Sequence, residues 1–468
     1  MKRIIIAFLL VGFAAKSQTI NPSNVAIDKE FSFNEFLGYV KKYHPLVKTA
    51  NLEISNAQAN LMMARGGFDP KIEVDFDQKQ FKNKDYYSVI NSSFKIPTWY
   101  GVEIKAGFDN NQGIFLNPEN NVPTNGLAAI GINVQLGQGL FINQRMADLR
   151  KAKFQIQLSQ AERKLEAIKV LYDAAVAYFN WKRNYNEVKL YQQYNVNAQI
   201  RFKGVKELIN QGDKPAIDSI EAGIIVKNRL LSLEDSQLKL TKAKLELSNF
   251  IWIENNIPVE LSDSLFPEEK LDTTIRETLR TNDLLNADFS ITNHPKINAL
   301  ERKVDMLRVD KDLKANMLLP KIDVGYSYLS EPSYIQDQNF NNYKLGMNFN
   351  FPLFLRKERG SLKIAKFKIQ ETEFALGLEK VQLTNKINAQ KIEIESLIKQ
   401  RNLIDGLVKD NNAMLTSEER LFSFGESSLF LINTRENNLV TAQLAAISLE
   451  NRFLISNSEL FKIMANPD

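Results

Sequence analysis

The sequence predicts an α+β fold in which one unit of long helices and β-hairpins occurs twice. His44-Pro45 recurs 250 positions later as His294-Pro295, and Gly212 recurs 213 positions later as Gly425. The difference between the two offsets leaves 37 extra residues inside the first unit. Runs of alternating apolar and polar residues lie between the matched segments, and a long proline-free stretch follows each run. Self-similarity at so long a period indicates a duplicated structural unit.

The first 17 residues have the pattern of a secretory signal peptide. Lys2 and Arg3 precede an apolar run from Ile4 to Ala15, and small residues then permit cleavage before Gln18. The run is too short to cross a bilayer as a helix. Without residues 1–17 the net charge falls from +5 to +2. We therefore expect an exported protein that does not bind nucleic acid.

Residue types exclude several kinds of chemistry. The chain has no cysteine, so it has no disulfide, thiolate metal site or cysteine nucleophile. Its two histidines, His44 and His294, each precede a proline and are expected to cap helices. No phosphate-binding loop or nucleophile elbow is present. We therefore predict no enzyme, no catalytic residue, no metal site and no cofactor.

Each unit is predicted to contain helices, strands, a very long helix and a returning helix. The first repeat covers 18–252, a connector covers 253–272, and the second repeat covers 273–468. The first repeat divides into helices over 31–65, strands within 71–138, a long helix over 143–211 and a returning helix over 215–252. The second divides into helices over 273–318, strands within 321–351, a long helix over 356–424 and a returning helix over 427–465.

Strict alternation of apolar and polar residues predicts six strands. Four belong to the first repeat (about 71–80, 87–96, 101–109 and 127–138), and two belong to the second (321–329 and 343–351). The pattern is typical of a half-buried sheet, and equally of a membrane barrel with lipid outside and water inside. The 37 extra residues correspond to one additional hairpin.

The long helices require lateral partners. From Asn143 to Gln211 there is no proline, and one helix of this length would measure about 100 Å. Apolar residues follow the 4-3 spacing of a coiled-coil seam. This seam consists of Ala161, Leu165, Ile168, Tyr172, Ala175 and Phe179. The four long helices of the two repeats cannot bury themselves against a compact core, so they must pack on one another or on other copies.

This order of elements resembles the TolC family of outer-membrane efflux channels, over about residues 31–465. Three pairs of matching segments carry the resemblance, together with the turns at Gly212 and Gly425. They are His44-Pro45 with His294-Pro295, Phe68-Asp69-Pro70-Lys71-Ile72 with Leu319-Pro320-Lys321-Ile322, and Leu140-Phe141 with Phe351-Pro352-Leu353-Phe354.

The resemblance implies a homotrimer in the outer membrane of a Gram-negative bacterium. Its strands would close into one shared transmembrane β-barrel, continued through the periplasm by an α-helical barrel. Glu73, Asp75 and Asp77 would then face the water-filled lumen, and the residues alternating with them would face lipid. Six strands depart from the family's usual four per subunit. Either the barrel is wider, or one hairpin folds outside it.

The resemblance also assigns roles to the two glycine turns. A periplasmic adaptor protein of an inner-membrane RND or ABC-type pump would dock on Gln211, Gly212, Asp213, Phe424, Gly425 and Glu426. A closed gate would lie just beyond, at Asp218 and Phe422. The family's second-half acidic positions are Leu431 and Thr434 here, and Ser427 replaces an arginine. Leu429, Phe430 and Leu431 would instead form an apolar constriction.

Two functions from different classes follow. The first is the exit duct of a tripartite efflux system or a type I secretion system. The second is an exported soluble coiled-coil scaffold or a helical pore-forming protein, which would not require strands at the same point of both halves. The sequence leaves the exported substrate and the pump class open.

Overall fold

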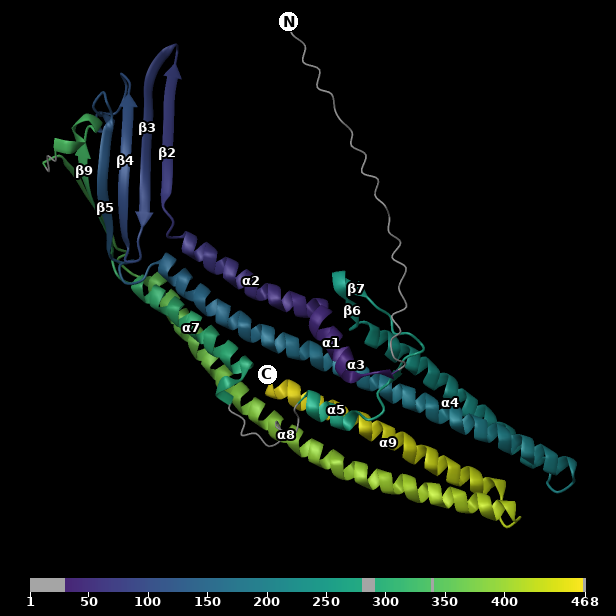
Figure 1. Ribbon diagram of the computed structural model, residues 1–468. Coiled ribbons are helices and arrows are strands. Elements are labelled where there is room, and N and C mark those ends of the chain that lie inside the picture. Colours follow the sequence, from purple (N-terminus) through teal and green to yellow (C-terminus); the bar gives the residue numbers. More distant parts are fainter. Residues whose placement is uncertain (1–29, 280–290, 338–340, 466–468) are drawn as a thin grey trace, which may run out of the picture.

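The computed structural model describes residues 30–279, 291–337 and 341–465. A β-sheet stands at one end of an elongated body, and the two turns between long helices lie at the other end (Figure 1). The expected signal peptide lies outside the described residues. Among the helices in these ranges, none has the length and hydropathy needed to cross a membrane.

The elements follow in the same order in both halves. The first half contains α1 (Phe33–Tyr43), α2 (Pro45–Gly66), β2 (Lys71–Phe81), β3 (Lys84–Pro97), β4 (Val102–Gln112), β5 (Leu127–Gly137), α3 (Gln144–Asn210) and α4 (Ile217–Ser248). The second contains α5 (Leu271–Thr278), α7 (Pro295–Asn316), β9 (Lys321–Ser330), β10 (Tyr343–Asn350), α8 (Arg356–Ser423) and α9 (Leu429–Met464). Short 3-10 turns occur at Pro118–Asn120, Glu254–Asn256, Ile291–Asn293 and Pro332–Asp337.

The connector differs from the expectation. The returning helix predicted over 215–252 ends at Ser248, and the strands β6 (Trp252–Ile253) and β7 (Ile257–Pro258) then form a small hairpin. Asn255 and Asn256 adopt left-handed φ angles of 66° and 58° in its turn, a conformation that asparagine tolerates well. Farther along, β8 (Phe266–Pro267) pairs in parallel with β1 (Glu30–Phe31). Residue 31 is therefore extended and not helical as predicted.

In the second half, the first helices of the repeat also differ from the prediction. Helices were expected over 273–318, but the first of them, α5, begins at Leu271 and already ends at Thr278. Residues 280–290 of that range lie outside the described residues. The described residues resume at 291, and His294 caps the N-terminus of α7.

Six strands form one antiparallel sheet in the order β10-β9-β5-β4-β3-β2. The two halves meet where β5 pairs with β9, and Val134 lies opposite Val324 there. Strands β2 and β3 are joined by Lys82 and Asn83, whose positive φ angles are typical of a tight two-residue hairpin. By their place in the repeat, β2 and β5 correspond to β9 and β10, so β3 and β4 form the additional hairpin. This hairpin is part of the same sheet and does not fold beside it.

The register gives the sheet one apolar face and one polar face. Residues directly opposite one another share a face, and successive residues alternate between faces. The apolar face includes Ile72, Val74, Phe76, Ile90, Phe94, Ile104, Phe108, Ile130, Ile132, Val134, Leu136, Ile322, Val324, Tyr326, Leu345, Met347 and Phe349. The polar face includes Glu73, Asp75, Asp77, Asn91, Lys95, Glu103, Lys105, Asp109, Asn133, Gln135, Asp323, Ser327, Lys344 and Asn348.

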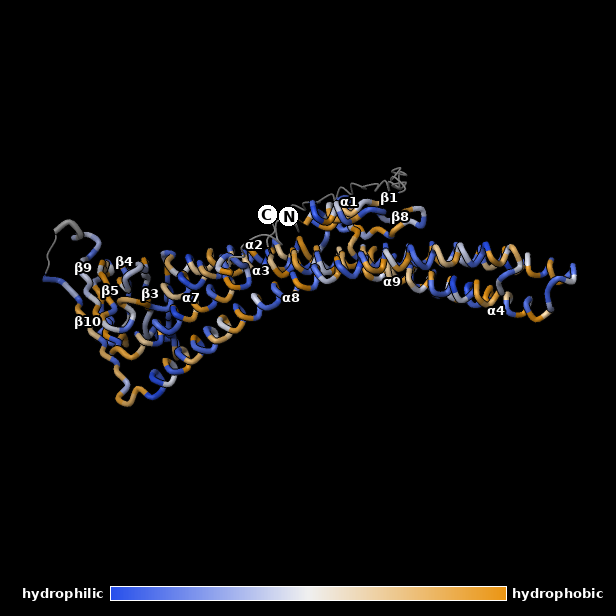
Figure 2. The backbone as a smooth tube through the Cα atoms, turned by 90° about the horizontal axis from the view of Figure 1, so that it is seen from below, coloured by the Kyte–Doolittle hydropathy of each residue, from blue (hydrophilic) through white to orange (hydrophobic). Residues whose placement is uncertain are grey.

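Helix α3 is the spine of the helical body, because α2, α4, α7 and α9 all pack against it. Near the sheet the helices lie side by side in the order α2-α3-α7-α8. Near the turns the order is α4-α3-α9-α8 (Figure 1). Apolar and polar residues alternate along these helices (Figure 2). The protomer is thus a curved layer with two open lateral edges.

The predicted seam of α3 lies in the core. Ala161, Ile168, Ala175 and Phe179 are buried, and Leu165 and Tyr172 are half-buried. In the largest core cluster, α1 packs across the middle of α3 with Phe33 and Phe36 around Tyr178 and Trp181. The Tyr178 hydroxyl donates to the Phe31 carbonyl at 2.6 Å and accepts from the Glu268 amide at 3.1 Å. These bonds tie the β1–β8 pair to α3.

Both histidines cap helices, as predicted. The Nδ1 atom of His44 accepts from the Leu46 amide at 3.3 Å, and that of His294 accepts from the Lys296 amide at 3.1 Å. His294 Nε2 also lies 2.9 Å from the Ile463 carbonyl at the end of α9. Burial lowers the pKa of both imidazoles, which matches a cap that needs an unprotonated nitrogen.

Candidate functional site

The two turns at the far end of the body have the same backbone geometry. In the first, Gly212 N–H donates to Ile209 and Asp213 N–H donates to Leu208. In the second, Gly425 and Glu426 donate to Phe422 and Leu421 in the same way. This pair of bonds defines the Schellman helix end, which satisfies the last carbonyls of a helix.

Backbone conformation explains the glycine at each turn. Gly212 has φ +81° and Gly425 has φ +78°, where residues with a Cβ are strained. Nothing lies within 4 Å of a Cβ built at either position. The glycines are therefore required by the turn itself and not by crowding within the protomer.

The six residues predicted to dock an adaptor are all exposed. Their side chains differ between the turns. The first turn presents the Gln211 amide and the Asp213 carboxylate, whereas the second presents the Phe424 ring, 72% exposed, beside Glu426. The turns thus offer the same backbone shape with different chemistry.

The predicted gate residues do not form one group. Phe422 is half-buried and packs in one apolar cluster with Val205, Ala222 and Leu429, which links the ends of α3, α4, α8 and α9. The Lys214 ammonium lies 5.2 Å from the Phe422 ring centre. Phe422 therefore helps to hold the two helical hairpins of one protomer together.

Leu429 does not fit the predicted constriction. It is only 5% exposed, because Ser428 caps the start of α9 and the first turn of that helix packs against α3 and α4. Phe430 and Leu431 are exposed, whereas Thr434 donates its hydroxyl to the Phe430 carbonyl and Asp218 is half-exposed. Phe430 and Leu431 remain candidates for the constriction.

A buried charged cluster, which the sequence prediction missed, joins the two helical hairpins. The Glu436 carboxylate on α9 is 1% exposed. It accepts from Arg201 of α3 at 2.7 Å and from Arg229 of α4 at 3.2 Å. Arg201 also lies 3.6 Å from Glu419 of α8. This cluster, here called the Glu436 cluster, therefore contacts all four long helices near the turns.

A signal for this cluster is present in the sequence. Glu436 falls between Ile432 and Leu439 at the 4-3 spacing of a seam, and Arg201 falls between Ala198 and Val205 in the same way. Charged residues at seam positions are costly unless they are paired. Their seam positions therefore predict that Arg201 and Glu436 form a buried ion pair.

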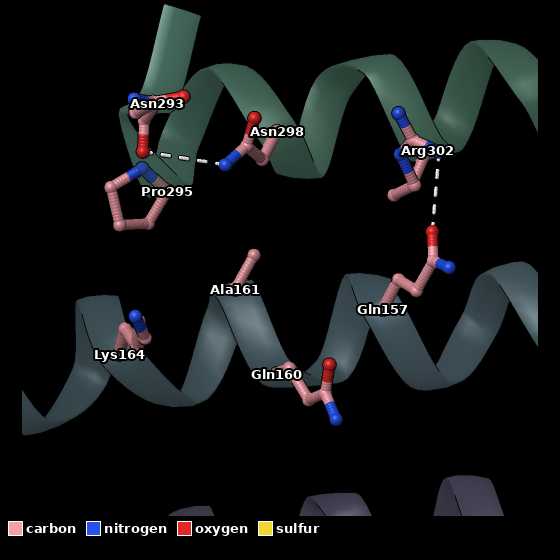
Figure 3. A pocket seen from close by; sticks show the side chains of 8 residues that line it. All are labelled: Gln157, Gln160, Ala161, Lys164, Asn293, Pro295, Asn298 and Arg302. Atoms are coloured by element: carbon pink, nitrogen blue, oxygen red, sulfur yellow. Dashed lines mark hydrogen bonds between the residues drawn. The ribbon is translucent and has the colours of Figure 1, made fainter.

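A groove in the helical body has no catalytic arrangement. It has a volume of about 410 Å³ and lies between α3 and α7 (Figure 3). Arg302 donates to Gln157 at 3.2 Å across it, and Asn298 donates to the Asn293 carbonyl at 3.3 Å. Its eight lining residues are amides, cations, an alanine and a proline. Within the described ranges, no cluster of acidic residues and histidines has the geometry to hold a metal ion.

The predicted lumen residues lie together on the polar face of the sheet. Glu73 forms an ion pair with Lys95 on the next strand, and the Tyr87 hydroxyl lies 3.4 Å from the Asp77 carboxylate. Glu73, Asp75 and Asp77 are all exposed. The apolar face behind them is also exposed at its edges, with Ile72 at 76% and Met347 at 70%. Among the described residues, no strand pairs with the outer edge of β2 or of β10.

Most of the second half of the chain matches a known protein family. The model described as "Outer membrane efflux protein" matches residues 288–466. This segment makes up less than half of the chain. Curated protein sequences gave no significant match.

Solved structures extend the likeness to the whole described fold. The CmeC outer membrane channel of Campylobacter jejuni has a TM-score of 0.65 and 13% identity, over 92% of this chain and 85% of that one. The MtrE outer membrane channel of Neisseria gonorrhoeae has a TM-score of 0.65 and 14% identity, over 92% and 88%. The outer membrane protein VceC of Vibrio cholerae has a TM-score of 0.64 and 13% identity, over 92% and 96%. The resemblance and the fold class predicted from the sequence are confirmed.

Proposed function

We propose that this efflux-family protein is the outer-membrane exit duct of a tripartite efflux system or a type I secretion system. The observation that carries the proposal is the six-stranded sheet, which has one apolar face and one polar face and stands beyond the helical body. Its strands contain eight to fourteen residues, which suits a tilted strand that crosses an outer membrane. The role is passage of cargo and not catalysis.

A sheet in lipid must have no open edge, because unpaired backbone groups are costly there. The open edges are β2 and β10. Strand β2 leads away from the helices and β10 leads back to them, so β2 of one copy can pair antiparallel with β10 of the next. Pairing of two β2 edges would instead point the helical bodies in opposite directions. The edges therefore favour a cyclic assembly.

The lateral edges of the helical body support the same assembly. On α4 an exposed apolar stripe recurs every seven residues, at Ile217, Ile224, Leu231, Leu238 and Leu245. On α8, at the other edge, Leu407, Met414 and Leu421 are also exposed with this spacing. Exposed heptad stripes are typical of helices that pack on a neighbouring chain. We infer that α4 packs on α8 of the next copy in a homotrimer.

The turns are the proposed contact with a periplasmic adaptor and, through it, with an inner-membrane RND or ABC-type pump. Their exposed side chains and identical backbone geometry support this role, since three copies would present six similar sites. A photoreactive amino acid at position 213 or 426 should crosslink to the adaptor in cells. A probe at Lys239, which lies on α4 away from the turns, serves as the control.

The gate is proposed to lie at Phe430 and Leu431, where apolar side chains close a pore by excluding water. Leu431→Ser should raise the single-channel conductance in planar bilayers. An unchanged conductance would remove Leu431 from the gate.

Cell fractionation tests the function as a whole. The full-length protein should remain with outer membranes after a high-salt wash, and the detergent-solubilised material should have the mass of a trimer. A soluble exported scaffold would instead be released by salt and would need no detergent. That result would overturn the proposal.

A further inference from the structure

We propose that the membrane barrel of this protein has eighteen strands, closed by pairing of β2 with β10 of the neighbouring copy. Three copies of a six-stranded sheet give this number. The inference rests on the proposed trimeric duct and goes beyond it. The resemblance alone implies four strands per subunit and therefore twelve.

Continuity of the two faces shows that the additional hairpin is built for the same environment as the other strands. Across β3 and β4, Ile90 and Ile104 lie on the apolar face, whereas Asn91 and Lys105 lie on the polar face. Strands β2 and β5 on either side keep the same division, with Ile72 and Ile132 on the apolar face. A hairpin outside the barrel would have to leave this face exposed to water.

Only the two outer strands of the sheet, β2 and β10, can pair with a neighbouring copy. The hairpin leaves β4 hydrogen-bonded on both sides, to β3 and to β5. Consequently β4 has no free edge for a neighbouring copy, and β2 does. With six strands the directions alternate all the way round a ring of any number of copies.

Charges at the two edges are complementary. On the polar face, Asp77 of β2 lies six residues from the helical end of its strand, and Lys344 of β10 also lies six residues from the helical end. Strands paired without a large stagger would place Lys344 opposite Asp77 or its neighbour on that face, Asp75. An opposite-charge pair across strands favours this register.

The number of strands sets the width of the exit. With strands about 4.8 Å apart and tilted by about 40°, eighteen strands give a barrel about 36 Å across its backbone, against about 24 Å for twelve. Twelve long helices at about 9 Å spacing, four from each protomer, give a tube about 34 Å across. The lumen would then not narrow at the membrane, and cargo width would be limited at the turns.

Disulfide scanning tests the closure directly, because the chain has no cysteine of its own. In the full-length protein, Val74→Cys on β2 is combined in turn with Leu345→Cys, Met347→Cys and Phe349→Cys on β10, all on the apolar face. Oxidation of isolated outer membranes should give covalent dimers and trimers for the pair in register. Each single-cysteine parent shows whether the variant still reaches the outer membrane as a trimer.

Two controls make the result decisive. Val74→Cys with Asn348→Cys places the thiols on opposite faces and should not crosslink. Ile104→Cys on β4, combined with the same three β10 positions, should also give no crosslink. The eighteen-strand barrel would be overturned if β10 crosslinked to β4 and not to β2. It would also be overturned if β10 crosslinked to neither strand. If the protein were still in the outer membrane, the proposed duct would stand, whereas release of the parents from the membrane would refute the duct itself.

Discussion

The two longest helices, α3 and α8, are counterparts in the duplication but differ in how much of each is buried. They have 67 and 68 residues. Helix α3 has 21 buried residues, whereas α8 has six. Helix α3 lies in the middle of the helical layer and α8 lies at its edge. The difference teaches that the position of a helix in the layer, and not its place in the repeat, decides which of its apolar residues are buried within one protomer.

The strongest test compares equivalent positions of the two helices. Phe179 of α3 is 0% exposed, and Ile392, 213 positions later in α8, is 66% exposed. Phe179→Ala should cost about 3 to 5 kcal/mol, because it leaves a cavity in the core. Thermal unfolding followed by circular dichroism measures this loss.

Ile392→Ala is the matched variant. It should change the unfolding of a dissociated protomer very little, but should weaken the trimer if Ile392 contacts a neighbouring copy. Equal losses at both positions in the protomer would contradict the contrast between centre and edge.

The second prediction concerns the cluster that joins the centre of the layer to its edge. Glu436→Gln leaves Arg201 and Arg229 buried without their carboxylate, and should cost about 3 to 5 kcal/mol. Glu419→Gln, at a half-exposed partner of Arg201, should cost less than about 1 kcal/mol. Denaturant unfolding of the purified protein compares the two variants. A cost at Glu436 no larger than that at Glu419 would mean that the cluster does not hold the hairpins together.

The third prediction compares the two turns. Gly212→Ala and Gly425→Ala should each cost about 1 to 2 kcal/mol, because both place a Cβ in the left-handed region. Gly204→Ala, inside α3 with open space around it, should instead stabilise by up to about 1 kcal/mol. Hydrogen exchange of the adjoining helix ends provides the measurement. Different effects at the two turns would show that their similarity does not extend beyond the backbone.

The smallest expected effect comes from the histidine caps. Their pKa values are lowered in the folded protein, so the unfolded chain binds protons first as the pH falls. Stability should be complete above the ordinary histidine pKa near 6.5 and should decrease as the pH falls through the lowered values. Melting temperatures between pH 7.5 and 5 measure this slope.

A double variant, His44→Asn and His294→Asn, supplies the control, because asparagine also caps helices but does not titrate. It should show a flatter profile over the same pH range. An unchanged slope would assign the pH dependence to other groups.

The sequence predicted the helices and strands because their periodicity records which residues face apolar surroundings. It predicted six strands, and the alternation of Ile72 to Asp77 reappears as two faces of the sheet. It did not predict the β1–β8 pair or the hairpin at Trp252, since two-residue strands carry too little periodicity. It also did not predict that Leu429 packs inward, because this packing depends on where α4 and α9 meet.

The way in which the chain passes through its sheet limits how such a protein can vary. Strand β2 leaves the helix α2, and β5 returns to α3 at the same end of the sheet. An insertion between them must therefore contain an even number of strands, or the chain would leave the sheet at the end away from the helices. In a ring of identical copies each inserted hairpin is repeated in every copy. The circumference can consequently grow during evolution in large, regular steps while the helical body below keeps its design.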